Sequence, residues 1–172
     1  MKIIRGITHV ELAVTDLDRS LRFYRDLLGL HEAGAPMLIT VPKGTQPREG
    51  GAGDCVDGLY EFPGRTMRVA VLRYADVPPG PFKLGYEPTG IVLLQPIDPP
   101  PSGEAIKVDQ VGISHIAFLV DGPVEAIEAR LAKAGTTIRG RQKIGTDDHP
   151  SASIFVEDPD GILIQLDIIP AS

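Results

Sequence analysis

The sequence has little of what several large classes of protein need. Its 172 residues include one cysteine, Cys55, and no tryptophan, so an intrachain disulfide is excluded. No long run of Lys or Arg occurs and the net charge is −6, which argues against a sequence-independent nucleic-acid binder because that class needs a basic surface. No uncharged apolar run approaches the roughly 20 residues of a membrane span, and the N-terminus does not resemble a signal peptide. We therefore expect a cytoplasmic protein without nucleic-acid or membrane partners.

What the chain does contain is an internal repeat. Residues Ile7–Val14 resemble residues Ile113–Val120, and the offset between His9 and His115 is 106 (115 − 9). A helix-like segment follows each copy and ends at a glycine, Gly29 in the first and Gly135 in the second, with the same offset. Since 42% of the residues are hydrophobic, two modules of similar build that share one core are expected.

Apolar spacing predicts one helix in each module. The first begins near Asp16 or Asp18, both good N-caps, and carries an apolar stripe at spacings of three and four. The second opens at Pro123, a residue suited to a first helical turn. The members of the two stripes are Leu17, Leu21, Tyr24 and Leu28, then Val124, Ile127, Leu131 and Ala134.

Strand-like segments follow each predicted helix, so each module is expected to have the order β-α-β-β-β. The segments are residues 36–41, 66–74 and 91–97 in the first module, and 136–139, 151–157 and 162–168 in the second. This pattern predicts an α+β protein. The expected organisation is a first module over residues 1–98 with a Gly/Pro-rich insertion at about 42–90, a linker over 99–110, and a second module over 111–172.

Strand alternation predicts where the histidines point. His9 shares a face with Glu11 and Ala13, whereas the opposite, apolar face of that strand is expected to pack against the helix. His115 is predicted to lie likewise in the second module. If the sheets curl, the side chains that can converge inside one cup are His9, Gln95, His115 and Gln165.

The sequence resembles the vicinal-oxygen-chelate superfamily, the glyoxalase, bleomycin-resistance and extradiol-dioxygenase type. Four motifs carry the resemblance, and together they span most of the chain except roughly residues 42–90. They are ITHVEL at 7–12, SLRFYRDLLGL at 20–30, SHIAF at 114–118 and DPDGILIQL at 158–166.

The resemblance implies two βαβββ modules that form a cupped, barrel-like mixed sheet with helices outside, often in homodimers. It also implies one divalent metal, for which Zn, Ni, Co, Mn or Fe are candidates. By position, its ligands would be His9, Gln95, His115 and Gln165. The family usually has Glu at the position of Gln165, so this set is neutral and leaves the metal charge uncompensated. Gln165 also cannot act as the base that a carboxylate can supply there.

Three functions from different classes stay open on this resemblance. The leading one is a metal-dependent isomerase, lyase or glyoxalase-like enzyme that acts on a small oxygenated substrate through a metal-stabilised enolate or similar anion. The second is a metal-free, drug-sequestering binding protein, which the two glutamines favour and the 5% aromatic content weakens. The third is an extradiol ring-cleaving dioxygenase, whose iron site typically requires two histidines and a carboxylate as ligands. Gln165 counts against this last reading.

Candidate catalytic residues outside the predicted ligand set are His149, Tyr60 and Glu61. His149 precedes a predicted strand and could act as an acid or base near neutral pH, or it could be a solvated loop residue. Tyr60 and Glu61 lie in the insertion, where they could close over a ligand or form an exposed lid surface.

Overall fold

The computed structural model describes residues 7, 9–40, 66–74, 90–146 and 149–169. The chain divides into two compact units, Met1–Ser102 and Gly103–Ser172, which we call unit 1 and unit 2. The boundary between them falls inside the predicted linker of residues 99–110. Each unit has its own sheet and helix, in keeping with the repeat in the sequence.

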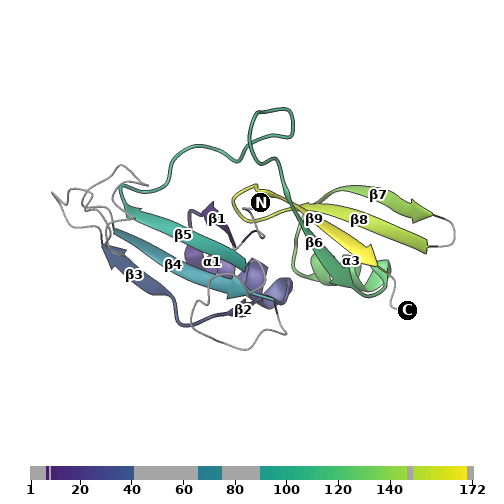
Figure 1. Ribbon diagram of the computed structural model, residues 1–172, viewed down its shortest axis with the longest axis horizontal. Helices are drawn as coiled ribbons and strands as arrows, with labels where there is room; N and C mark the ends of the chain where they lie inside the picture. The colour runs from purple at the N-terminus through teal and green to yellow at the C-terminus, as the bar shows by residue number, and fades with distance from the viewer. Residues whose placement is uncertain (1–6, 8, 41–65, 75–89, 147–148, 170–172) are drawn as a thin grey trace, which may run out of the picture. The chain divides into compact units, whose positions relative to one another are not determined.

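Unit 1 is built on a mixed five-stranded sheet. The strand order is β1-β5-β4-β2, and β3 also pairs with β4, as Figure 1 shows. Strand β1 runs parallel to β5, whereas β4 runs antiparallel to β5, β2 and β3. The strands are β1 (His9–Ala13), β2 (His31–Glu32), β3 (Met37–Thr40), β4 (Thr66–Arg73) and β5 (Gly90–Asp98).

The helical part of unit 1 begins where the sequence predicts it. The Asp16 side chain accepts a hydrogen bond from the Arg19 backbone N–H at 3.0 Å and caps helix α1 (Leu17–Leu21). The next six residues continue as a π-helical segment, η1 (Arg22–Leu27). Gly29 then ends the element with φ +89°, a conformation that glycine adopts without strain.

Unit 2 is a mixed four-stranded sheet with one helix. The strand order is β6-β9-β8-β7, with β6 parallel to β9 and the other neighbours antiparallel. Helix α3 (Val124–Lys133) follows Pro123 and ends before Gly135, whose φ is +71°. The strands are β6 (Ile116–Asp121), β7 (Ile138–Thr146), β8 (His149–Glu157) and β9 (Leu163–Ile169). The predicted strand at residues 136–139 overlaps only the first two residues of β7, which continues to Thr146.

In each unit, one helix covers one face of the sheet. In unit 1 the first-turn N–H of Leu17 donates to the Gln95 side chain, so α1 lies on the face to which Gln95 points. In unit 2 the Arg141 guanidinium forms an ion pair with Glu128 of α3, which places α3 on the Arg141 face. The buried side chains on these helix-covered faces include Leu12, Leu72, Ile91 and Leu93 in unit 1, and Phe118, Ile154, Leu166 and Ile168 in unit 2.

The α+β class and the β-α-β-β-β order of both modules are confirmed. Unit 1 adds one short strand, β2, that the sequence pattern did not indicate. No helix in the part of the chain that the structure describes is long and apolar enough to cross a membrane.

Candidate functional site: the open faces of the two sheets

We call the side of each sheet away from its helix the open face. In unit 1 the register pairs Glu11 with Val92 and Ala13 with Leu94 on the neighbouring strands β1 and β5. Paired residues point to the same side of a sheet, and side chains alternate along each strand. His9 therefore lies on this open face with Glu11, and both side chains are exposed. The predicted orientation of His9 away from the helix agrees with this register.

Most of the remaining side chains on the open face of unit 1 are apolar, and the exception on β4 is the buried Arg73, which strand alternation places on the same side as Val69. Met67, Val69 and Leu94 form a buried cluster, against which Ile39 and Val92 pack. Strands β3, β4 and β5 contribute these side chains, which the register places on the same side as Glu11. The face therefore combines an imidazole and a carboxylate on β1 and a guanidinium on β4 with an apolar cluster.

Gln95 lies on the opposite side of this sheet from His9. Its carbonyl oxygen accepts hydrogen bonds from the Leu17 backbone N–H at 3.1 Å and from Arg68 Nη1 at 3.4 Å. Its amide donates to the Thr15 carbonyl at 3.2 Å. Arg68 also binds both oxygens of Asp18, and this hydrogen bonding lowers the pKa of the Asp18 carboxyl. Gln95 thus anchors the start of α1 to the sheet. Because it points to the opposite side of the sheet from His9, the two side chains cannot bind the same metal ion or small molecule in this arrangement.

The strand registers identify the position in unit 1 that corresponds to Gln165. Val10 and Ile116 are equivalent by the 106-residue offset, and they pair with Ile91 and Ile164 respectively. One residue further along each strand, Val92 corresponds to Gln165. The two glutamines that the sequence matched by type therefore do not occupy matching positions, and the equivalent of Gln165 in unit 1 is an apolar side chain.

Replacing Gln95 with alanine should destabilise unit 1. The Leu17 side chain is fully buried, and its N–H would lose the acceptor that satisfies it, at a cost of about 1–2 kcal/mol in the free energy of unfolding. Urea denaturation would measure the loss. The exposed Gln142 on β7 offers a matched control, and a Gln95→Ala loss no larger than that of Gln142→Ala would contradict the anchoring role.

The open face of unit 2 carries His115 beside an aromatic wall. His115 lies one residue before β6, and its ring is 6.4 Å from the ring of Phe155, with the planes inclined at 73°. Phe155 pairs with Gln165, and Ala117 pairs with Gln165 from the other side. His115, Phe155 and Gln165 therefore share one face. The Ser114 hydroxyl lies 3.0 Å from His115 Nδ1, which holds the imidazole in place.

A small polar network orients Gln165. Its amide nitrogen donates to Asp167 Oδ1 at 2.7 Å and lies 3.3 Å from Ser153 Oγ. The Ser153 hydroxyl, which is fully buried, donates a short hydrogen bond to the same Asp167 oxygen. In the described part of the chain no donor reaches the Gln165 carbonyl oxygen. This oxygen is therefore a fixed acceptor that can receive a hydrogen bond from a bound molecule.

Of the three predicted catalytic residues, the structure describes one and leaves two outside the described residues. His149 begins β8 and pairs with Thr146, while Tyr60 and Glu61 lie outside the described residues. Within the described residues no group of three or more His, Cys, Asp or Glu side chains is arranged to hold a metal ion. Convergence of His9 with His115, and the ligand roles of His9, His115 and Gln165, stay predictions.

Sequence reasoning missed Phe155, Ser153 and Asp167 as residues of this face. A signal for them existed in the alternation of the last two strands. Asp167 is two residues from Gln165, and the hairpin turn at 158–161 sets which residues of the preceding strand lie opposite. The register of this turn sets Phe155 opposite Gln165 and Ser153 opposite Asp167.

Comparisons with known proteins agree with this fold. Residues 6–166 match the family model described as the Glyoxalase/Bleomycin resistance protein/Dioxygenase superfamily. The chain is similar to the structure of a glyoxalase family protein from Bacillus cereus, with 21% identity over 99% of this chain and 97% of that one and a TM-score of 0.69. No curated protein matches the chain.

Two further solved structures are similar at lower identity. A lactoylglutathione lyase from Agrobacterium tumefaciens has 17% identity over 97% of this chain and 96% of that one, with a TM-score of 0.51. A fosfomycin resistance protein from Listeria monocytogenes has 15% identity over 96% and 94%, with a TM-score of 0.55. The likeness to these two structures is a likeness of fold.

Proposed function

The chain belongs to the Glyoxalase/Bleomycin resistance protein/Dioxygenase superfamily, and from this premise we propose that it binds a small oxygenated molecule on its open faces without a resident divalent metal. The observation that carries the proposal is the register of β1 and β5, which sets Val92 at the position matching Gln165 and turns Gln95 toward α1.

The side chains at the matching positions do not suit a metal centre. Members of this superfamily commonly use divalent metals, for which carboxylate, imidazole or thiolate ligands are preferred. Here the matching positions carry His9 and Val92 in unit 1 and His115 and Gln165 in unit 2. Valine has no donor atom, and the other three side chains are neutral when they act as ligands. The side chains at the matching positions therefore give no support for a metal-dependent chemical step in this protein.

The same residues do suit recognition of an oxygen-bearing molecule. The Gln165 carbonyl is held as an acceptor, so a ligand hydroxyl or N–H can donate to it. The exposed His115 imidazole can donate to a ligand carbonyl or ether oxygen, and Phe155 provides an apolar wall beside it. A ligand with an oxygen-rich end and an apolar body is the class that these contacts favour.

Metal analysis gives the first test. After incubation with Zn²⁺, Ni²⁺, Co²⁺, Mn²⁺ or Fe²⁺ and gel filtration, the purified protein should retain far less than one equivalent of any of these ions, because the matching set lacks a carboxylate and one donor. The His9→Ala and His115→Ala variants should retain the same small amount. Near-stoichiometric metal that is lost in both variants would overturn the proposal and restore the metal-dependent isomerase, lyase or glyoxalase-like enzyme.

Ligand binding in the presence of a chelator completes this test. Fosfomycin, lactoylglutathione and bleomycin, which the names of the family and its solved members suggest, serve as probes in ¹H–¹⁵N spectra recorded with EDTA. At least one should shift the amides of Ala117, Phe155 and Gln165 without added metal. Binding or turnover of any probe that requires metal contradicts the proposal, as does the absence of binding by all three.

A dioxygenase is the less favoured enzymatic alternative, because its iron site needs a carboxylate beside the two histidines. Oxygen consumption with catechols would reveal it. The homodimer and the cytoplasmic location remain proposals that rest on the family resemblance and on the composition.

A further inference from the structure

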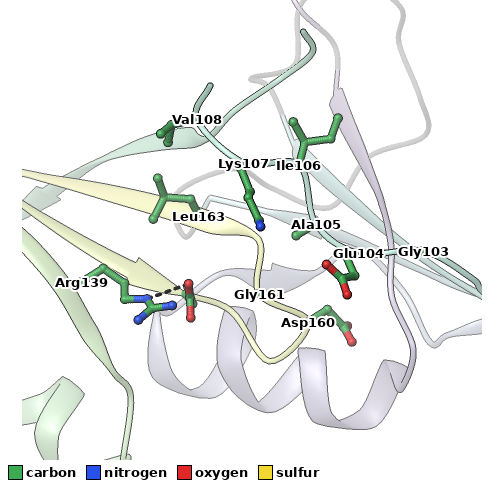
Figure 2. A pocket seen from close by; sticks show the side chains of 11 residues that line it. Gly103, Glu104, Ala105, Ile106, Lys107, Val108, Arg139, Asp160, Gly161 and Leu163 are labelled. Atoms are coloured by element: carbon green, nitrogen blue, oxygen red, sulfur yellow. Dashed lines mark hydrogen bonds and ion pairs between the residues drawn. The ribbon is translucent and has the colours of Figure 1, made fainter. Parts of the chain in front are cut away.

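A cavity of about 460 Å³ lies in unit 2, and two of its lining residues, Leu163 and Glu157, are on the open face, two positions along their strands from Gln165 and Phe155. Residues 103–108 form one side of it, and the ends of strands β7, β8 and β9 with the turn that joins β8 to β9 form the other (Figure 2). Its size is within the range of about 300–1,000 Å³ that is common for small-molecule sites. The cavity therefore borders the site of the proposed function, but none of its lining residues is among those that support that function, so the inference below rests on different residues.

Backbone contacts and hydrogen bonds position the two sides of this cavity, the segment 103–108 and the turn that joins β8 to β9. Gly161 has φ +84°, and a Cβ built on it would lie 3.8 Å from the Ala105 Cβ, so the turn and the segment approach each other there. The Lys107 N–H donates to the Gln110 side chain at 2.8 Å, and the Gln110 N–H donates to the Lys107 carbonyl at 3.0 Å. These two bonds fix the backbone from which the Lys107 side chain extends.

The cavity lining combines charges of both signs with an apolar wall. Arg139 Nε donates to Glu157 Oε1 at 2.7 Å, so these two charges largely neutralise each other. In the described part of the chain, the side chains of Lys107 and Glu104 form no ion pair or hydrogen bond. In Figure 2 the Lys107 ammonium extends into the middle of the cavity, with Glu104 and Asp160 toward one end and Arg139 toward the other. The apolar lining is Ala105, Ile106, Val108 and Leu163.

We propose that this cavity binds a small zwitterion with an apolar body, of the amino-acid or dipeptide class. The carboxylate of such a molecule pairs with the Lys107 ammonium and can also reach the guanidinium N–H groups that Arg139 does not use for Glu157. The ligand ammonium pairs with Glu104, and the aliphatic side chain lies against Ile106 and Leu163. A single-sign ligand would leave either Lys107 or Glu104 facing a like charge, which is unfavourable at this range.

The test uses leucine and leucyl-leucine as probes on the full-length ¹⁵N-labelled protein. Both should shift the amide signals of residues 103–108 and 157–163. N-acetylleucine, which lacks the ammonium, and leucinamide, which lacks the carboxylate, should bind about two- to fivefold more weakly than leucine, because both pairing side chains are exposed. The Lys107→Gln and Glu104→Gln variants should show a comparable loss for leucine. These substitutions affect exposed side chains, so the fold is expected to be retained.

Two matched controls lie on the exposed surface of α3. Lys133→Gln and Glu125→Gln remove the same charges elsewhere in unit 2 and should leave leucine binding unchanged. The proposal is overturned if neither probe shifts these amides at concentrations up to about 10 mM. It is also overturned if the two analogues bind as tightly as leucine, or if the Lys107 and Glu104 variants behave like the controls. Shifts confined to His115 and Phe155, without residues 103–108, would also overturn it and assign the zwitterion to the neighbouring part of the open face.

Discussion

Replacing Leu93 with alanine is expected to lower the free energy of unfolding of unit 1 by about 2–5 kcal/mol. Leu93 is fully buried in β5, where the register sets it between Leu12 on β1 and Ala70 on β4. It lies on the helix-covered face, so truncation leaves a cavity that the flanking strands, fixed by their ladders, cannot close by moving together. Urea denaturation with hydrogen exchange of the β4 and β5 amides would measure the loss.

Ile97 on the same strand is the matched control. Its side chain is 44% exposed, so Ile97→Ala should change the free energy of unfolding by no more than about 0.5–1 kcal/mol. Equal losses for the two variants would mean that the core of unit 1 does not lie between β5 and α1. The register from which the placement of Gln95 is argued would then need revision as well.

The repeat made most of the fold predictable. The common offset placed β1 and β6, and it also placed the two glycines that end the helical elements, because both ends need a backbone conformation that glycine adopts readily. Hydrophobic alternation then placed β4, β5, β8 and β9. These elements are stabilised by a buried face of their own, and this burial is visible in the residue pattern.

The elements that the sequence did not indicate depend on their neighbours. Strand β7 is longer than predicted because its central part carries Arg141, Gln142 and Lys143, a stretch without apolar alternation, whose strand structure comes from pairing with β8. The π-helical segment after α1 is another example, since the Leu28 N–H bonds to the Phe23 carbonyl five residues earlier. Such a shift follows from packing rather than from propensity.

The candidate site shows how a match by residue type can mislead. The strand registers make Gly90 in unit 1 equivalent to Leu163 in unit 2. Gln165 lies two residues after Leu163, whereas Gln95 lies five residues after Gly90. Side chains alternate with a period of two, so a difference of three residues, an odd number, reverses the face on which the side chain lies. Gln95 therefore points toward the helix, and the strand register, rather than the identity of the two residues, determines this.

The polar network of unit 2 was less accessible to sequence reasoning. Ser153, Gln165 and Asp167 come together because β8 and β9 pair in one particular register. Shifting that pairing by one residue would leave the same sequence with Ser153 on the helix-covered face. The β8–β9 turn fixes this register, so the turn controls the candidate site although it contributes none of its polar atoms.

Replacing Asp158 with alanine is therefore expected to have the second large effect, a loss of about 2–4 kcal/mol in the free energy of unfolding of unit 2. The Asp158 side chain is only 5% exposed, and its Oδ1 accepts hydrogen bonds from the N–H groups of Asp160 at 2.9 Å and Ile162 at 2.8 Å. Alanine would leave both donors without this acceptor inside a tight turn, where Gly161 already holds a left-handed conformation. Thermal and urea denaturation would measure the loss.

The conservative variant separates the role of this oxygen from that of the surrounding packing. Asp158→Asn keeps a carbonyl oxygen that can accept the same two N–H bonds, but without the charge, so its loss should be about half that of alanine or less. Asp109→Ala, at an exposed position in the same unit, should have almost no effect. If Asp158→Ala were as stable as Asp109→Ala, the turn would not depend on this carboxylate. The β8–β9 register, and with it the grouping of Ser153, Gln165 and Asp167 on the open face, would then have to be fixed by the strands themselves.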